Sequence, residues 1–288
     1  MPSHNRFSSL FFRSINAFSI FFKSIGFALK YFKNNRFIDL FYFRKAIEIA
    51  HTSPFRIIIP PFKKQEIVEI QLPHFGNVKL NFHLNDYFQM AICEEFIKYK
   101  IYNLGLIGFL PDHSIDCGAY QGYFSFLIAE KYPECKKICI EPHPENYKSL
   151  LSGIINNNIQ KVTTFNKALS TIKGKISLEL WGSNMAKLYS IKSSTNEVSV
   201  ETIDLYEFLN VIKANESLVI KVDIEGGELD FFPACIDKLP AKCAVYLETH
   251  DAWRSLKGIE QKFVESGFSF SILRDRGLYI DSYAVRNG

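Results

Sequence analysis

The stretch Asp116-Cys117-Gly118-Ala119-Tyr120-Gln121-Gly122 begins at the end of a predicted strand, residues 114–117. It leads into a helical pattern that begins near residue 124. Glycine lets a backbone turn sharply and approach a ligand closely, and the first N–H groups of a helix are free to bind one. The stretch therefore predicts a ligand-binding turn between a β-strand and a helix. A glycine turn alone is a weak signal, so the next strand matters.

A second predicted strand, residues 137–141, ends at Glu141, which Pro142 follows, about twenty residues after the turn. The two oxygens of one carboxylate match the two adjacent hydroxyls of an adenosine ribose, because each oxygen can accept a hydrogen bond. The turn and the carboxylate together predict an adenosine-containing ligand. The pair is more specific than either signal alone.

Charge separates the two adenosine ligands that such a turn can bind. NAD requires a pyrophosphate on the helix and a full G-x-G-x-x-G pattern, whereas this turn has the pattern D-x-G-x-x-x-G and begins with Asp116. An acidic residue disfavours a pyrophosphate and favours a cation, and S-adenosylmethionine carries an ammonium and a sulfonium. We therefore predict a methyltransferase, with a nucleotide-binding oxidoreductase and a non-catalytic protein that keeps the fold as alternatives.

Strands and helices are predicted to alternate strictly after Pro111. Such alternation is typical of an α/β protein with a parallel sheet and helices on both faces, in which ligands bind beyond the carboxyl ends of the strands. The predicted strands are residues 114–117, 137–141, 161–167, 218–223, 243–249 and 268–273. The predicted helices follow Gly122, Pro144, Gly227 and Ala252.

The N-terminal segment differs in composition from the rest of the chain. Residues 1–38 hold six Lys or Arg and no Asp or Glu, so the other residues carry +4 minus +6, or −2. Residues 6–33 place Phe and Leu on one helical face and basic residues on the other, and the charges interrupt the segment too often for a membrane span or a signal peptide. Two interpretations stay open. The helix lies in a membrane interface, or its Phe face packs on the catalytic domain or on a second subunit of a homo-oligomer.

The next segment predicts a small β meander in three runs, residues 56–59, 66–70 and 78–82, followed by a helix over residues 87–102. The helical pattern of the N-terminal segment continues over residues 35–51 and ends at the prolines that precede the meander.

Cysteine spacing and charge limit the cellular location and the partners that the sequence predicts. The six cysteines form neither a dense disulfide framework nor a paired zinc pattern, which predicts reduced thiols in a cytoplasmic protein. The positive charge is confined to the N-terminal segment, so we predict no nucleic-acid partner. Contact with the inner face of the membrane through residues 6–33 is the one exception to a freely cytoplasmic location that we consider.

Five segments in order resemble the FkbM-type methyltransferase family: the turn at residues 116–122, Glu141-Pro142-x-Pro144-x-Asn146, residues 166–170, residues 200–204 and residues 220–228, which contain the K-x-D-x-E-G pattern. The resemblance implies a class I methyltransferase fold, Rossmann-like, with a seven-stranded, mostly parallel sheet. It implies S-adenosylmethionine as the cofactor and a hydroxyl of a sugar, glycan or small metabolite as the methyl acceptor. Tyr120 departs from the family, which more often has Asn at that place.

The chain is accordingly predicted to divide into an amphipathic helical extension (1–53), a β meander with a helix (54–104) and the methyltransferase domain (105–288). Residues expected to bind the cofactor are those of the turn, the second strand end and two later strand ends. They are Asp116, Gly118, Ala119, Tyr120, Gln121, Gly122, Glu141, Pro142, Ala168 and Asp223.

Three residues at later strand ends are candidates for catalysis. His250 ends the predicted strand 243–249, and an unperturbed imidazole pKa near 6.5 suits a general base. Asp223 and Glu225 are two residues apart and point into the same site if the strand is still extended there. The same three residues, Asp223, Glu225 and His250, with Glu248 as an alternative to His250, are the predicted ligands if a divalent cation such as Mg²⁺ or Ca²⁺ is bound. Lys221 is expected to form an ion pair with one of these acids.

Overall fold

In the computed structural model of the chain, the described residues are 67–71, 75–83, 100–171, 173–181, 185–188, 197–250, 256–277 and 279–288. Residues 69–81 and 93–288 form one compact unit, and the other residues belong to a second unit. The predicted extension 1–53, with its amphipathic segment 6–33, lies outside the described residues. The three-part division of the chain and the contact with a membrane or a second subunit therefore stay predictions.

Two strands of the predicted meander are present. Strands β1 (Ile67–Gln71) and β2 (Lys79–His83) pair in a two-stranded sheet. The predicted strand 56–59 falls outside the described residues. Of the predicted helix 87–102 only residues 100–102 are described, and residues 101–102 form a turn instead of helix.

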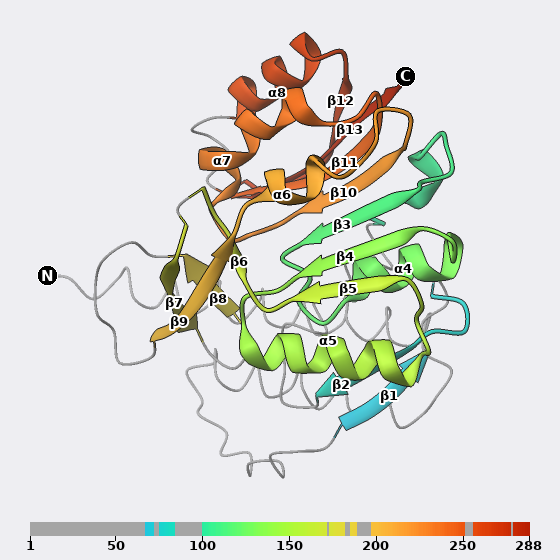
Figure 1. Ribbon diagram of the computed structural model, residues 1–288, viewed down its shortest axis with the longest axis vertical. Coiled ribbons are helices and arrows are strands. Elements are labelled where there is room, and N and C mark those ends of the chain that lie inside the picture. Colours follow the sequence, from blue (N-terminus) through green and yellow to red (C-terminus); the bar gives the residue numbers. More distant parts are fainter. Residues whose placement is uncertain are drawn as a thin grey trace, which may run out of the picture. The chain divides into compact units, whose positions relative to one another are not determined.

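A seven-stranded sheet forms the centre of the larger unit, and its order β12-β13-β11-β10-β3-β4-β5 confirms the predicted class I methyltransferase fold (Figure 1). The five strands from β11 to β5 are parallel, and β13 is antiparallel to both β11 and β12. The parallel strands are β3 (His113–Cys117), β4 (Lys136–Ile140), β5 (Val162–Phe165), β10 (Leu218–Val222) and β11 (Lys242–His250). The remaining two are β12 (Ser269–Asp275) and β13 (Tyr279–Asn287).

Helices cover both faces of this sheet, as predicted. On one face, alternate residues of β3, β10 and β11 pack in a single core with α6 (Leu205–Leu209), α7 (Glu228–Cys235) and α8 (Leu256–Glu265). On the other face, Tyr246 of β11 meets Phe124 of α4 (Tyr123–Lys131), with ring centroids 5.9 Å apart. Strands β3 and β10 are buried along their whole length, which explains their continuous apolar character.

The helix after β4 shows how local sequence sets an element boundary. Helix α5 (Pro144–Asn156) begins with Pro144 in its first turn, where a missing N–H costs nothing. His143 precedes it, and its Nδ1 accepts a hydrogen bond from the N–H of Glu145 at 3.2 Å. This N-cap leaves Glu141 and Pro142 between the strand end and the helix, at the edge where a ligand is expected.

A second sheet lies between β5 and β10 in the chain, with the order β6-β9-β7-β8. Its strands are β6 (Ala168–Leu169), β7 (Lys175–Trp181), β8 (Met185–Leu188) and β9 (Glu197–Ile203). Strand β6 begins three residues after β5 ends, so this sheet starts beyond the carboxyl end of a parallel strand (Figure 1).

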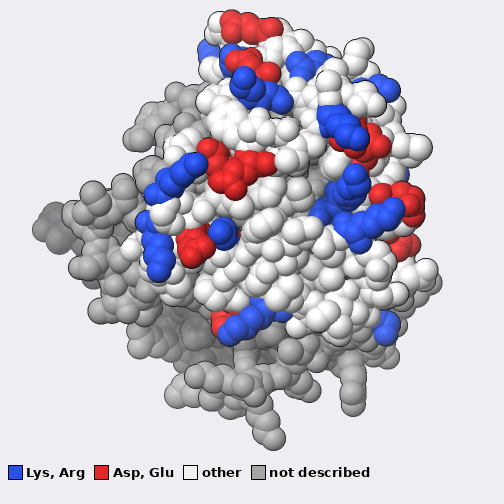
Figure 2. Space-filling model, in the orientation of Figure 1, with Lys and Arg blue, Asp and Glu red and all other residues white. Residues whose placement is uncertain are grey.

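In the described residues, surface charges of both signs are mixed (Figure 2) and the cysteines are buried. On the face drawn in Figure 2, basic and acidic residues are interspersed with neutral ones, and no broad basic patch is seen among the described residues. Five cysteines, all buried, carry free thiols. Among the helices of the described ranges, none is both long and apolar enough to span a membrane.

Candidate active site

The core of the site is a row of side chains that the strand register places side by side. Lys221 of β10 pairs with Asp116 of β3 on one side and with Tyr246 of β11 on the other. Partners in register on parallel strands point to the same face, so these three side chains lie together on the side covered by α4. The row is buried, with Asp116 1% and Lys221 5% exposed.

Asp116 faces this buried row instead of an open ligand site. Its Oδ2 accepts a hydrogen bond from Ser125 of α4 at 2.8 Å, and its Oδ1 lies 3.6 Å from Nζ of Lys221. Burial raises the pKa of Asp116, against the lowering effects of Lys221 and Ser125. Asp116 thus already faces a cation of the chain, Lys221, and its contact with the cofactor stays a prediction.

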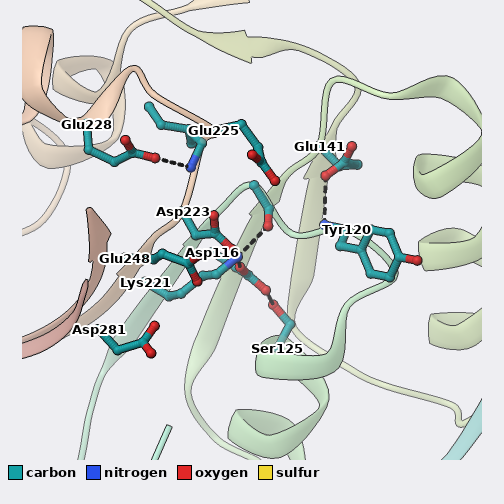
Figure 3. Close-up of polar contacts among 12 residues, drawn as sticks. Asp116, Tyr120, Ser125, Glu141, Lys221, Asp223, Glu225, Glu228, Glu248 and Asp281 are labelled. Carbon is teal, nitrogen blue, oxygen red and sulfur yellow. Dashed lines mark hydrogen bonds and ion pairs between the residues drawn. The ribbon is translucent and has the colours of Figure 1, made fainter. Parts of the chain in front are cut away.

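Lys221 joins two strand ends through its charge. Its Nζ donates a hydrogen bond to the carbonyl oxygen of Gly118 and lies 3.4 Å from Asp223. Burial by itself lowers the pKa of Lys221, but the surrounding carboxylates, Asp223 and Asp116 first, outweigh burial and raise it. Lys221 is therefore charged and forms the ion pair that its position predicts (Figure 3).

The glycines of the turn allow close packing, Gly118 next to the end of β10 and Gly122 next to helix α5. Gly118 has φ +75°, and a Cβ there would lie 1.8 Å from the carbonyl oxygen of Asp223. Gly122, with φ +92°, is the N-cap of α4, and a Cβ would lie 2.6 Å from Leu150. At Gly118, the backbone group that approaches closely is the carbonyl oxygen of Asp223, from the chain itself. Tyr120 also has a positive φ, +52°, which is uncommon for a residue with a side chain.

Glu141 is held in one orientation by two backbone groups. Its Oε2 accepts from the N–H of Tyr120 at 2.7 Å, and its Oε1 accepts from the N–H of His143 at 2.8 Å (Figure 3). Burial raises the pKa of Glu141 to about 7, against the lowering effect of these bonds. The Asn146 side chain also donates to this carboxylate, whose two oxygens have about four acceptor positions between them, so one is left for a ligand hydroxyl. The assignment of Glu141 to a ribose stays a prediction, and this geometry fits it.

The other predicted cofactor residues lie at the same edge. Ala119, Gln121 and Ala168 are buried, and Pro142 is partly exposed. Asn166, which we did not select, donates from Nδ2 to the carbonyl oxygens of Glu141 at 2.8 Å and Pro142 at 3.1 Å, and thereby joins the ends of β4 and β5. Nε2 of His143 is buried and has no hydrogen-bond partner in the described part of the chain.

The loop after β10 carries the two predicted catalytic carboxylates. The side chains of Asp223 and Glu225 are 26% and 32% exposed. Glu225 has φ +57°, so the chain is no longer extended where it leaves the strand. Both carboxylates nevertheless remain beside His250, because the loop folds back on the end of β11.

His250 ends β11 among carboxylates, which changes its expected protonation. Its Nε2 lies 3.2 Å from Oε2 of Glu225 and 3.7 Å from Oε1 of Glu248, and its Nδ1 lies 3.1 Å from Oε1 of Glu228. Burial by itself lowers the pKa of His250, but the hydrogen bonds to Glu225 and Glu228 raise it to about 11. The ordinary imidazole pKa near 6.5, which suits a general base, therefore does not apply to His250.

Two site residues, Glu228 and Arg276, were not predicted as such, although Glu228 ends the family-like segment 220–228. Glu228, at the start of α7, is fully buried and contacts His250. Arg276, in the turn between β12 and β13, lies 2.9 Å from both Glu248 and Asp281. Burial raises the pKa of Glu248 well above its ordinary value, and Asp223 adds to this effect. The parity of Glu248 with His250 on β11 was the only available signal.

The three residues predicted as metal ligands are brought together. Asp223, Glu225 and His250 each offer one ligand atom, and these atoms lie within 4.8 Å of one another. That span is about twice a Ca²⁺–oxygen distance of about 2.4 Å, so a Ca²⁺ ion fits between the ligand atoms. A Mg²⁺–oxygen distance is about 2.1 Å, so the three side chains would have to move slightly toward a Mg²⁺ ion. His250 must also lose its proton before it can bind a cation.

The chain is similar in sequence to one family model and in fold to solved structures of methyltransferases. The family described as "Methyltransferase FkbM domain" matches residues 116–270. A solved structure of M. jannaschii TYW2 in complex with AdoMet is similar at 11% identity and TM-score 0.45, covering 80% of this chain and 90% of that one. A precorrin-6y C5,15-methyltransferase from Geobacter metallireducens GS-15 is similar at 11% identity and TM-score 0.41, covering 64% and 86%. No curated protein sequence matches significantly.

The sheet order and the residues at its carboxyl edge define a class I methyltransferase, whose cofactor is S-adenosylmethionine. The family match spans more than half of the chain, from Asp116 at the start of the turn to Phe270 in β12. The chain therefore belongs to the FkbM methyltransferase family, as its sequence segments indicated.

Proposed function

We propose that this protein transfers a methyl group from S-adenosylmethionine to a hydroxyl oxygen of a sugar, glycan or small metabolite. The observation that carries the proposal is the pair of partly exposed carboxylates, Asp223 and Glu225, next to His250 at the carboxyl edge of the sheet. Methylation of an oxygen requires that the acceptor hydroxyl lose its proton, and a carboxylate within hydrogen-bond reach can take it.

The cofactor, when bound, supplies an electrophilic methyl group on a sulfonium centre. Glu141 would accept a hydrogen bond from the ribose, since two backbone N–H groups already fix its orientation and a carboxylate has more acceptor positions than the chain's own donors fill. The buried Nε2 of His143 offers a further polar contact beside it. Asp223 would lie between the cofactor and the acceptor, because it follows β10 next to the turn at Gly118.

The acid–base roles follow from the charge state of His250. With a pKa of about 11 it carries a proton at neutral pH and donates hydrogen bonds. We therefore assign proton acceptance to Asp223 or Glu225, and we assign to His250 the orientation of Glu225 through its contact with Oε2 at 3.2 Å. Positioning of an acceptor close to the methyl group would supply most of the remaining rate.

A second candidate uses the same three residues to hold a divalent cation. The 4.8 Å span of their ligand atoms favours this arrangement, and a bound cation would polarise an acceptor oxygen. Electron paramagnetic resonance with Mn²⁺ tests it directly. Binding that is lost in Glu225→Gln and kept in Glu207→Gln, an exposed control, supports the cation. Absence of binding to the wild type removes it.

Calorimetry with S-adenosylmethionine tests the cofactor site. We expect binding to the wild type and a loss of about tenfold or more in affinity for Glu141→Ala, because ribose hydroxyls lose their acceptor. Glu145→Ala is the matched control, since this side chain is 64% exposed one turn away. No binding to the wild type would leave only the non-catalytic alternative, and normal binding to Glu141→Ala would remove the ribose assignment.

Labelled methyl transfer tests the acceptor. Cell extracts and glycan fractions are incubated with protein and methyl-labelled cofactor, and products are identified by mass spectrometry. With an acceptor in hand, Glu225→Gln should lower kcat about 100-fold or more while cofactor affinity is kept, and Asp223→Asn should lower kcat by a similar factor. Unchanged turnover in both variants contradicts the assigned proton acceptors, and a label on nitrogen or carbon contradicts oxygen methylation.

A further inference from the structure

Glu228 is a fully buried carboxylate to which the proposed chemistry gives no part. It stands at the first position of α7, and its side chain points back over the loop that precedes the helix (Figure 3). Oε1 accepts a hydrogen bond from the N–H of Ile224 at 2.8 Å, and Oε2 accepts one from the N–H of Gly226 at 3.1 Å. Its third contact is with Nδ1 of His250, at 3.1 Å from Oε1.

The first two contacts suffice for a structural role. A buried carboxylate must be hydrogen-bonded to be tolerated, and two backbone N–H groups at a helix N-terminus provide that. The contact with His250 is different in kind, because it reaches from α7 to the end of another strand, β11. A residue that only closed the loop would not need it.

The geometry of an imidazole explains what this contact achieves. The two ring nitrogens lie on different sides of the ring, so a partner that holds Nδ1 also determines where Nε2 points. Here Nε2 points to Oε2 of Glu225 at 3.2 Å. Glu225 belongs to the same loop that Glu228 holds through Ile224 and Gly226.

The loop needs such support because of its backbone conformation. Glu225 has φ +57°, in the left-handed region, which is unfavourable for a residue with a side chain. Such a conformation persists only where the surroundings enforce it. The N–H groups on either side of Glu225, those of Ile224 and Gly226, are both bound by the one carboxylate of Glu228.

We propose that Glu228 is a positioning residue of the methyl-transfer site. Its single carboxylate sets both members of the His250–Glu225 contact, one through the imidazole Nδ1 and the other through the loop backbone. The inference rests on the proposed function, in which Glu225 and His250 face the acceptor. Loss of Glu228 frees the ring and the loop to move independently.

The test is Glu228→Gln in the full chain, observed by long-range ¹H–¹⁵N spectra of the imidazoles. The His250 signals are assigned by their absence in His250→Gln. We expect the Nδ1 signal of His250 to shift or vanish by exchange in Glu228→Gln. Glu207→Gln makes the same change in the first turn of α6 at an exposed site and should leave the signal in place. An unchanged His250 signal in Glu228→Gln overturns the proposal.

Cofactor binding separates this proposal from the proposed function. Calorimetry with S-adenosylmethionine should give Glu228→Gln an affinity within about twofold of the wild type, because Glu141 lies on a different strand end. Loss of binding together with a general collapse of the spectrum makes Glu228 a purely structural residue and overturns the inference. A wild type that binds no cofactor refutes the proposed function, while the imidazole spectra still decide the role of Glu228.

A second variant keeps the idea testable if Glu228→Gln does not fold. In His250→Gln, the shared carboxylate loses one partner, so the backbone amide signals of Ile224 and Gly226 should shift. Unchanged amide signals would show that His250 and the loop are not coupled through Glu228. Once an acceptor is known, kcat of Glu228→Gln should fall about 10- to 100-fold with the KM for the cofactor unchanged.

Discussion

Replacement of Glu141 by Gln should make the pH dependence of stability visible. The buried carboxyl has a pKa of about 7 in the folded chain, raised from 4.5 by burial. A group whose folded pKa is raised stabilises the fold at low pH, and this contribution is lost as the pH rises through the folded value. The window therefore runs from about pH 4.5 to about pH 7.

The expected magnitude follows from the same shift. Proton linkage over a rise of this size gives about 2.5 kcal/mol of lost unfolding free energy between about pH 5 and about pH 8. Glu141→Gln cannot ionise, so it lacks this loss. It carries instead a constant penalty of about 1 to 3 kcal/mol, because its amide NH₂ must face one of the two N–H groups, of Tyr120 or His143, that now donate to the carboxylate.

Urea unfolding followed by circular dichroism measures both effects. We expect the difference in unfolding free energy between wild type and Glu141→Gln to change by about 2.5 kcal/mol in favour of the variant between about pH 5 and about pH 8. Glu265→Gln, on the exposed end of α8, is the control and should show no such change. A difference that is the same at both pH values would refute the reasoning that Glu141 is buried with a raised pKa.

Two further substitutions test the packing around the site, both by thermal and urea unfolding. Gly118→Ala should lower the unfolding free energy by at least about 2 kcal/mol, because the new Cβ would lie 1.8 Å from the carbonyl oxygen of Asp223. The control Gly258→Ala has open space around its Cβ and should be neutral or stabilising. Equal losses of unfolding free energy in the two variants would contradict the clash at Gly118. Lys221→Met should cost about 3 to 5 kcal/mol, because it leaves buried carboxylates uncompensated; the exposed Lys148→Met should cost at most about 1 kcal/mol, and a Lys221 variant as stable as this control would contradict the buried ion pair.

Prediction from sequence succeeded where the signal is local. The apolar runs, the glycine turn and the carboxylate after the second run indicated the parallel sheet, its order of elements and the methyltransferase class. Strand β13 had no predicted counterpart, and the antiparallel pairing of β11, β13 and β12 came only from the implied family fold. A register shift between Ile272 and Arg274 interrupts the regular alternation of β12, although Asp275-Arg276-Gly277 before β13 is a turn sequence.

Prediction failed where a property depends on neighbours in space. His250 was assigned an ordinary pKa, but Glu225 and Glu228, more than twenty residues away, keep it protonated. The partner of Asp116 was likewise not predicted, because the register of β3 and β10 alone places Lys221 beside it. Neither sequence position carries a mark of these contacts.

The amino-acid sequence by itself determined the family, the order of strands and helices, and which residues stand at the carboxyl ends of the strands. Strand and helix periodicity and glycine turns depend on residues close along the chain, so they can be read from it. Only the tertiary structure decided which of those residues carry a proton, which face a buried ion pair, and that Glu228 holds both the loop and His250. Burial and charge act through space across distant segments, and these effects exist only once the sheet has formed.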